Sequence, residues 1–365
     1  MRQAGRATPE GTAAYAKRLE GRVAAGHFHD ADGVSWSSIG LGTYLGKPDD
    51  ATDALVESAV EKALAAGVNV IDTAINYRFE RAEKSIGRAL ARASGKHAIK
   101  REEFVVCTKG GYLPHPTRGE WFQSHYVGQG GISKEDLVAD SHCMHPVYLL
   151  GELDRSRVNL GIDTLDVYYI HNPEAQVGAV DADTFRHRLR EAFGVLESAA
   201  DEGRIGAYGI ASWNAFRVKP GEKGYISLVE AKTLARQAAG GGEDRFKYIQ
   251  LPFNVAMREA HATPTQKVGD RMLPAIQAAI SLGLRPVLSG AIAQARFGKL
   301  PPTIAERLGA DLPGDGARAL QFARSVPGAL TALVGMKQPP HVAENLSLTQ
   351  VPPLDAETFA KLLSR

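Results

Sequence analysis

Four polar side chains of different chemistry stand at the ends of predicted β-strands. Asp72 ends one strand and Tyr77 follows it by five residues, while Lys109 and His171 end the next two strands. If these strands run parallel in one closed sheet, their carboxyl ends meet at one mouth and the four side chains point toward it. A carboxylate, a phenol, an ammonium group and an imidazole are groups that proteins use to transfer protons. Their joint placement predicts an acid–base site.

Taken singly, each of these residues also has a structural interpretation. Asp72 suits the cap of a turn, and Tyr77 suits the packing of a loop. Lys109 suits a solvated rim, and His171 suits a hydrogen-bonded histidine in the core. The coincidence of all four at strand ends favours the functional interpretation.

The elements that must position these residues alternate regularly. Amphipathic helical patterns, such as residues 52–66 and 184–202, separate eight β-rich runs at 37–42, 68–72, 104–108, 165–171, 207–211, 248–251, 285–289 and 331–335. Eight such units predict an α/β fold of the (β/α)8 TIM-barrel type rather than two doubly wound domains. We therefore expect residues 1–365 to form a single barrel domain.

Two regions depart from this alternation. Residues 1–33 form an N-terminal extension with a predicted helix at about 9–23 and a strand that begins a hairpin. Residues 110–147 form a long loop after the third strand, and loops on that face make it a candidate lid. Its aromatic residues Trp121 and Tyr126 either line a substrate pocket or pack the loop on itself.

Composition narrows the classes of partner and compartment. The 365 residues carry 43 basic and 41 acidic side chains without a basic stripe, which argues against nucleic-acid binding. No apolar stretch approaches the ~18 residues of a membrane span, and no apolar core follows the first residues as in a secretory signal. Two cysteines cannot build a disulfide framework. We expect a cytoplasmic protein that acts on a small molecule and leave its oligomeric state open.

Two further motifs carry little weight. Gly40-Leu41-Gly42-Thr43-Tyr44-Leu45-Gly46 is similar to a dinucleotide fingerprint, but its third glycine comes one place too late. His142-Cys143-Met144-His145 mixes metal-ligand types, but no second cluster stands at zinc spacing. We therefore predict neither a Rossmann fold nor a metal site.

The polar strand ends belong to a longer series of short motifs in fixed order. The series comprises Gly40-Leu41-Gly42-Thr43, Val70-Ile71-Asp72-Thr73-Ala74 with Tyr77, Glu83-Lys84-Ser85-Ile86-Gly87, Thr108-Lys109, Leu160-Gly161-Ile162-Asp163-Thr164-Leu165-Asp166, Tyr169-Ile170-His171, Gly203-Arg204-Ile205, Gly209-Ile210, Gln250 with Asn254, and Glu344-Asn345-Leu346. This ordered set resembles the aldo-keto reductase superfamily over most of the chain. The resemblance implies a barrel enzyme that transfers a hydride with a nicotinamide cofactor.

The resemblance assigns the family's catalytic tetrad to Asp72, Tyr77, Lys109 and His171. Tyr77 would give a proton to a carbonyl oxygen, or take one from an alcohol in the reverse direction. A free phenol has a pKa of about 10, so we expect the Lys109 ammonium to favour the phenolate and lower that pKa. Asp72 would pair with Lys109, and His171 would donate to or orient the carbonyl oxygen.

The resemblance also implies the contacts of the cofactor. At the nicotinamide end these are Gly42, Thr43, Asp72, Asn172, Ser212, Gln250 and Ser289. The sequence departs from the family there: Ala211-Ser212 replaces the usual Ser-Asn pair, and Ser289 stands where an aromatic ring often stacks on the nicotinamide.

At the adenosine end the implied contacts are Lys337, His341, Glu344 and Asn345. Lys337, with help from Arg296, would reach an adenosine 2′-phosphate, which favours NADP(H) over NAD(H). His341 stands where many members carry arginine. The prolines before it mark a helix start, and the first turn of a helix has free N–H groups that suit a phosphate.

The predicted activity is NAD(P)(H)-dependent reduction of an aldehyde, ketone or sugar-like carbonyl, or oxidation of the matching alcohol. Two alternatives stay open. One is a redox-neutral lyase or epimerase that keeps NADP bound. The other is a non-catalytic, cofactor-sensing regulatory subunit, which would bind the cofactor without turnover.

Overall fold

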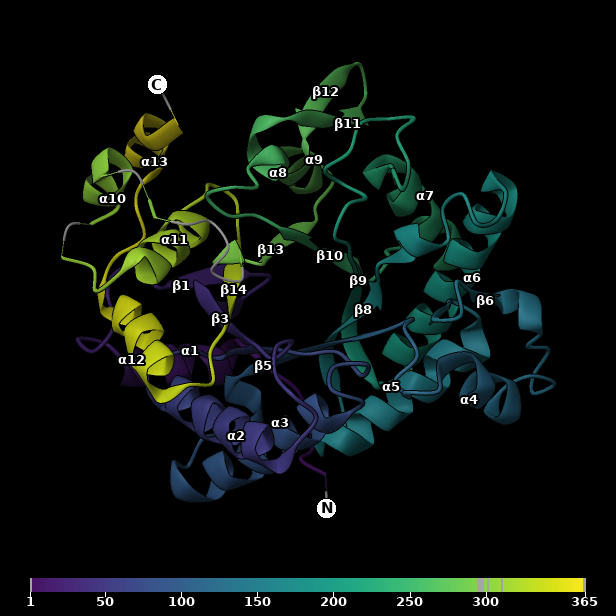
Figure 1. Cartoon of the computed structure of the whole chain (residues 1–365), viewed down its shortest axis with the longest axis horizontal. Coiled ribbons are helices and arrows are strands. Elements are labelled where there is room, and N and C mark those ends of the chain that lie inside the picture. The colour runs from purple at the N-terminus through teal and green to yellow at the C-terminus, as the bar shows by residue number, and fades with distance from the viewer. Residues whose placement is uncertain (1, 294–298, 301, 310, 364–365) are drawn as a thin grey trace.

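Eight parallel strands form a closed barrel in the computed structural model, which describes residues 2–293, 299–300, 302–309 and 311–363 (Figure 1). Around the barrel the strands follow the order β10-β13-β14-β3-β4-β5-β8-β9. Their bounds are β3 Ile39–Gly42, β4 Val70–Asp72, β5 Val105–Gly110, β8 Leu165–His171, β9 Ile205–Ala211, β10 Phe246–Pro252, β13 Arg285–Ser289 and β14 Thr331–Gly335. All eight predicted strands are present, and the TIM-barrel prediction is confirmed.

Helices surround the barrel (Figure 1), and their buried apolar side chains belong to one core cluster with those of the strands. Helix α2 (Asp50–Ala65) begins where the Asp49 carboxylate accepts a hydrogen bond from the Thr52 N–H, which satisfies one free donor of the first turn. It buries Val56, Ala59, Val60, Ala63 and Leu64, as its periodicity predicts. The other covering helices are α3 Arg81–Lys96, α5 Pro146–Leu160, α6 Ala182–Asp201, α7 Leu228–Ala238, α9 Ala275–Ser281, α11 Asp315–Arg324 and α12 Pro339–Ser347.

The N-terminal extension covers the amino-terminal end of the barrel. Helix α1 (Pro9–Arg18) precedes an antiparallel hairpin of β1 (Phe28–Ala31) and β2 (Val34–Ser37), so the predicted hairpin is confirmed. The helix ends earlier than predicted, because the chain turns through Gly21 at a φ of 75°. Trp36 of β2 is buried and stacks on Tyr248 of β10, with 5.3 Å between ring centres. The hairpin therefore fills one end of the barrel and leaves the opposite end for the site.

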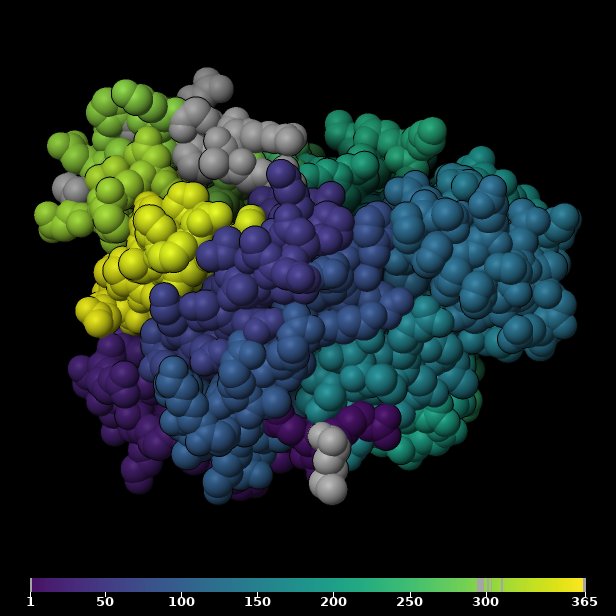
Figure 2. Space-filling model, turned by 60° about the horizontal axis from the view of Figure 1, so that its bottom comes forward, coloured from purple at the N-terminus to yellow at the C-terminus, as the bar shows by residue number. Residues whose placement is uncertain are grey.

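The predicted segment 110–147 begins with the last residue of β5 and ends in the first turn of α5. Between them the chain forms a folded insertion on one side of the barrel, in blue at the right of Figure 2. The insertion contains helix α4 (Arg118–His125) and the short strands β6 (Leu137–Val138) and β7 (His142–Cys143). Trp121 is buried and stacks against His125, with 5.2 Å between ring centres. Tyr126 is also buried and donates a hydrogen bond to Glu152 Oε1 over 2.9 Å. Of the two interpretations for these aromatics, the structure supports packing of the insertion rather than lining of a pocket.

Two carboxyl groups lie buried between β5, α3 and α5. Glu83 accepts hydrogen bonds from Thr108 Oγ1 (2.6 Å) and Asn159 Nδ2 (2.9 Å). Glu152 of α5 receives the Tyr126 hydroxyl on one oxygen, and its other oxygen has no hydrogen-bond partner in the described part of the chain. Burial raises the pKa of Glu83 to about 7 and that of Glu152 to about 8.

These raised pKa values predict a pH-dependent stability. Folded Glu152 keeps its proton up to a pH of about 8, whereas an unfolded glutamate releases it near pH ~4.3. The free energy of unfolding therefore decreases as the pH rises between these values. Glu152→Gln should make this decrease shallower in urea titrations at several pH values. The exposed Glu120→Gln should retain the wild-type slope, and a wild-type slope in Glu152→Gln would contradict the analysis.

Candidate active site

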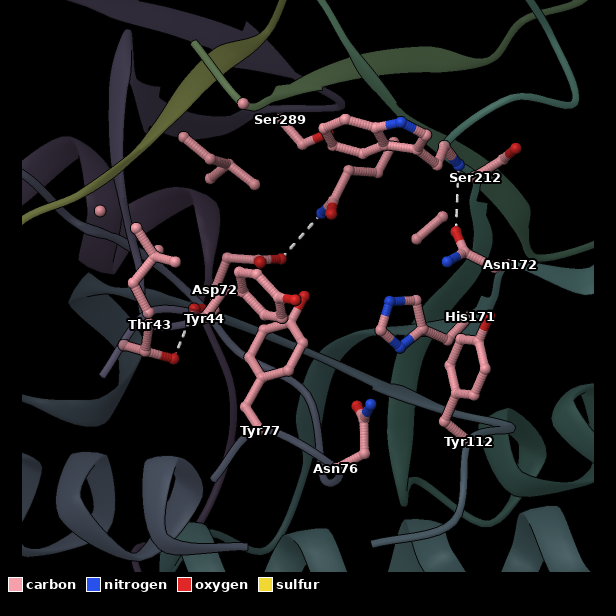
Figure 3. A pocket seen from close by; sticks show the side chains of 18 of the residues that line it. Thr43, Tyr44, Asp72, Asn76, Tyr77, Tyr112, His171, Asn172, Ser212 and Ser289 are labelled. Carbon is pink, nitrogen blue, oxygen red and sulfur yellow. Dashed lines mark hydrogen bonds between the residues drawn. The ribbon is translucent and has the colours of Figure 1, made fainter. Parts of the chain in front are cut away.

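A cavity of about 500 Å³ opens at the carboxyl ends of the barrel strands (Figure 3). This is the end of a TIM barrel at which active sites form. Most of the predicted site residues line it, namely Gly42, Thr43, Asp72, Tyr77, His171, Asn172, Ser212, Gln250 and Ser289.

A buried ion pair lies at the base of this cavity. Lys109 Nζ on β5 donates to Asp72 Oδ1 on the neighbouring strand β4 over 2.6 Å and to the Thr73 carbonyl over 2.7 Å. The second Asp72 oxygen accepts a hydrogen bond from Gln250 Nε2 of β10 over 2.8 Å. Lys109 is only 1% exposed and does not itself line the cavity. Both charges are thus held in fixed positions by hydrogen bonds.

Tyr77 lies beside this pair, with Lys109 Nζ 5.3 Å from the centre of its ring. Burial raises the pKa of the Tyr77 hydroxyl, and the Lys109 charge only partly opposes that rise. The predicted attraction of the Lys109 ammonium for the phenolate is therefore present, but desolvation of the phenolate outweighs it and the net pKa lies above its ordinary value. Burial lowers the pKa of Lys109 while the Asp72 charge raises it, and the net direction is upward. At neutral pH the site contains a protonated phenol next to an ammonium group.

The backbone after Tyr77 is unusual. Arg78, Phe79 and Glu80 all have left-handed conformations, with φ values of 51°, 54° and 69°. Such conformations are costly for residues other than glycine and persist where surrounding contacts enforce them. Here the buried Arg78 guanidinium forms an ion pair with Asp53 of α2 and donates to Ser85 Oγ over 3.2 Å. The turn that carries Tyr77 is thereby fixed to the first helices of the barrel.

His171 forms the opposite side of the acid–base site (Figure 3). Its ring packs edge-on against Tyr77 and Tyr112, with centre-to-centre distances of 5.8 and 5.1 Å. Its carbonyl oxygen lies 2.8 Å from His142 Nε2. Burial and the charge of Lys109 lower the pKa of His171 well below its usual range. We therefore describe His171 as a neutral imidazole at the cavity wall.

Asn172 and Ser212, two predicted cofactor contacts, differ in whether the structure leaves a polar group of the side chain toward the cavity. The Asn172 carbonyl oxygen accepts a hydrogen bond from the Trp213 N–H over 3.0 Å, which leaves its amide NH2 toward the cavity (Figure 3). Ser212 Oγ, in contrast, donates to Glu174 Oε1 over 2.8 Å and accepts from the Ala215 N–H over 2.7 Å. The Ser212 hydroxyl is thus already used within its own loop.

The predicted adenosine contacts lie outside this cavity. Lys337, His341, Glu344 and Asn345 follow β14 and are absent from its described lining. Glu344 Oε1 accepts a hydrogen bond from the Ala317 N–H over 3.3 Å, and Asn345 is buried. Arg296, expected to assist Lys337, lies outside the described residues.

Sequence reasoning missed two residues that shape the cavity beside β9, Trp213 in the loop after β9 and Glu174 in the loop after β8. Trp213 lines the cavity with 43% of its surface exposed. Glu174 fixes the same loop, since its Oε1 accepts hydrogen bonds from the backbone N–H groups of Trp213 (2.9 Å) and Asn214 (3.0 Å) as well as from Ser212. A lone tryptophan directly after a strand end was the available signal for the first residue. The glutamate offered no signal, because its role depends on two loops meeting.

No group of three or more histidine, cysteine, aspartate or glutamate side chains that would suit a metal ion is found among the described residues. None of the described helices is both long and apolar enough to span a membrane.

Residues 38–230 match the model of the Aldo/keto reductase family. Among curated proteins, the chain is 28% identical over 205 residues to the NADH-specific methylglyoxal reductase of Escherichia coli (strain K12). It is 30% identical over 190 residues to the D-threo-aldose 1-dehydrogenase of a Pseudomonas species. These matches cover 54% and 50% of this chain and 56% and 52% of the relatives. The chain thus spans about half the length of the curated relatives it matches.

Solved structures share the fold over nearly the whole chain. An aldo/keto reductase from Klebsiella pneumoniae in complex with NADP and acetate superposes with a TM-score of 0.61 at 19% identity, covering 91% of this chain and 92% of that one. The glycerol dehydrogenase of Gluconobacter oxydans superposes with a TM-score of 0.60 at 19% identity, covering 93% and 94%. At this identity the likeness is evidence for the barrel fold.

The environment of His171 yields a prediction independent of any substrate. Because its pKa is lowered well below 6.5, the ring should stay neutral as the pH falls through 6.5 and take a proton only in more acidic solution. Nitrogen-15 NMR of labelled protein measures this, and His171→Asn identifies the signal by its loss. A His171 ring that titrates between pH 6 and 7 would refute the description of a buried neutral imidazole.

Proposed function

This chain belongs to the aldo/keto reductase family, and on that basis we propose that it is an NAD(P)(H)-dependent oxidoreductase of small carbonyl compounds. It would reduce an aldehyde, a ketone or a sugar-like carbonyl, or oxidise the corresponding alcohol. The observation that carries the proposal is the buried Lys109–Asp72 pair, which lies beside Tyr77 at the base of a cavity that His171 also lines.

Tyr77 is the proposed general acid. A nicotinamide cofactor, when bound, supplies the hydride for the carbonyl carbon. As negative charge grows on the carbonyl oxygen, the Tyr77 hydroxyl gives up its proton to that oxygen. The Lys109 ammonium near the ring stabilises the phenolate that this transfer leaves behind. Asp72 holds the ammonium in place through the 2.6 Å contact.

His171 is the proposed second partner of the carbonyl oxygen. A neutral imidazole donates a hydrogen bond from its N–H without competing with Tyr77 as a proton source. Its ring already lies edge-on to Tyr77, so both groups approach the same point of the cavity. The substrate oxygen would thus be oriented by two donors of fixed position.

The residues at the cavity fit the amide-bearing end of a nicotinamide. Gln250 uses its Nε2 on Asp72, which leaves its carbonyl oxygen as an acceptor. Asn172 uses its side-chain Oδ1 on the Trp213 backbone, and its NH2, which also lies beside the Tyr112 hydroxyl, is the proposed donor. A carboxamide needs one donor and one acceptor, and Gly42, Thr43 and Ser289 complete the proposed contacts.

We further propose NADP(H) as the favoured cofactor. Solved structures of the same fold contain NADP or NADPH, whereas one curated relative is named NADH-specific. In this chain the support is Lys337, whose Cε lies 3.5 Å from where a β-carbon on Gly46 would stand, beside the loop after β3. A cation there suits a 2′-phosphate.

Lys337→Met tests this preference. Loss of one partly solvated charge should raise the KM for NADPH by about two- to fivefold and leave the KM for NADH unchanged. Steady-state kinetics with both cofactors measure the ratio, and Lys17→Met on α1, at the other end of the barrel, serves as the control. An equal effect on both cofactors would remove Lys337 from the phosphate site.

Tyr77→Phe tests the mechanism. The variant loses the proton donor but keeps the ring, so turnover should fall by about a hundredfold or more while cofactor affinity stays nearly unchanged. Nicotinamide absorbance is followed with NADPH or NADH and a panel of aldehydes, ketones and oxidised sugars. Tyr225→Phe, away from the cavity, is the matched control.

The same assay separates the alternatives. Tyr77-dependent consumption of cofactor supports the reductase. Wild-type turnover that Tyr77→Phe retains would refute the role of Tyr77. Cofactor binding without consumption across the panel would favour the redox-neutral or the regulatory alternative.

A further inference from the structure

We propose that the indole of Trp213 forms the flat wall against which the nicotinamide ring of the bound cofactor lies. The inference rests on the proposed cofactor and adds a positioning residue that the family motifs do not assign. Trp213 stands two residues beyond the end of β9 and lines the cavity together with Gln250, Ser289 and Gly290.

The ring of Trp213 lies over the end of β13. Its Cη2 and Cζ3 atoms are 3.6 and 3.7 Å from the position that a β-carbon on Gly290 would take. Gly290 has a φ of 60°, which favours glycine, and a β-carbon there would lie in ordinary van der Waals contact with the indole and with Pro252 of β10. The six-membered part of the indole therefore reaches from the β9 loop to the strand ends that carry Gln250 and Ser289.

Trp213 differs from the other rings of the cavity. Tyr44, Tyr77, His171 and Tyr112 form a chain of edge-on contacts with centre-to-centre distances of 5.0, 5.8 and 5.1 Å. Within the described residues, Trp213 makes no such ring contact. It is 43% exposed, so an unpaired aromatic face borders the cavity.

The backbone beneath this ring is fixed. The Trp213 N–H donates to Asn172 Oδ1 over 3.0 Å and to Glu174 Oε1 over 2.9 Å, and its carbonyl oxygen accepts from Arg217 Nε over 2.9 Å. The Asn172 side chain thus holds the Trp213 backbone through Oδ1, and the same side chain is our proposed contact for the carboxamide of the nicotinamide. Because this backbone is already fixed, stacking of a ligand would need only the indole side chain to be ordered.

β13 itself supplies no aromatic ring. Its last residues are Leu288, which is buried in the core, and Ser289. An indole from the loop after β9, on the other side of β10, would therefore provide a stacking surface at this end of the barrel.

The proposal has a consequence for the redox state of the ligand. An oxidised nicotinamide ring carries a positive charge and the reduced ring does not. Tryptophan is the aromatic side chain that attracts cations most strongly through its face. Trp213 should therefore favour NADP⁺ or NAD⁺ over the reduced forms.

Calorimetric titrations test the proposal with two probes that differ only in the nicotinamide-bearing part. The probes are NADP⁺ and 2′-phospho-ADP-ribose, which lacks the nicotinamide but keeps the ribose that carries it. NAD⁺ and ADP-ribose are titrated in parallel. Trp213→Ala should raise the Kd for NADP⁺ by about two- to thirtyfold, change the Kd for NADPH less, and leave that for 2′-phospho-ADP-ribose within twofold. Trp213→Phe, which keeps a ring, should lie between Trp213→Ala and the wild type.

The outcomes are distinguishable. If the wild type binds NADP⁺ or NAD⁺ and Trp213→Ala binds it equally well, the stacking role is refuted and the proposed function stands. Equal weakening of both probes would mean that Trp213 only supports the loop, which also refutes the stacking role. If the wild type binds neither dinucleotide, the proposed function itself fails.

Discussion

The candidate site depends on keeping two opposite charges buried at the mouth of a barrel. Removing Lys109 and Asp72 from water is costly, and the cost is offset only if their remaining donors and acceptors are satisfied. Here the ammonium also contacts the Thr73 carbonyl, and the carboxylate also receives the Gln250 amide. These requirements fix the geometry of β4, β5 and β10 at once. They also set the electrostatic environment of Tyr77 and His171, whose pKa values move in opposite directions, upward and downward, because in both cases burial disfavours the charged form.

The two ends of the barrel differ: one is filled by apolar side chains, and the other holds the cavity of the candidate site. At the amino-terminal end, Trp36 and Tyr248 belong to a cluster with Val70, Val105 and Val167 that fills the interior. At the carboxyl-terminal end, the interior gives way to polar side chains and a cavity. The insertion after β5 combines a core of its own with contacts to the cavity. Its core packs around Trp121 and Tyr126, while Tyr112 and Arg118 reach the cavity.

The alternation of strands and helices could be predicted because it follows from the local periodicity of apolar residues. All eight strands lie where that periodicity predicts them. The meeting of Asp72 and Lys109 also followed, since neighbouring parallel strands bring their carboxyl ends together. The pKa values and hydrogen-bond partners of the site could not be predicted, because each depends on opposing effects of residues far apart in the sequence. The Tyr77 pKa depends on burial against charge, and the Ser212 hydroxyl is used by Glu174, a residue from another loop. The catalytic and cofactor roles of these residues stay predictions.

The hydrogen bond from Gln250 to Asp72 joins residues 178 positions apart. Their strands, β10 and β4, are four places from each other in either direction around the closed sheet. Such long-range contacts form only after much of the chain has been ordered, because closing so large a loop is entropically costly. The charged pair therefore acquires its full set of partners at barrel closure, late in folding. A ribosome-bound chain that has emerged only as far as β9 would hold Asp72, Tyr77, Lys109 and His171 without the final clamp, so the site matures with the last third of the sequence.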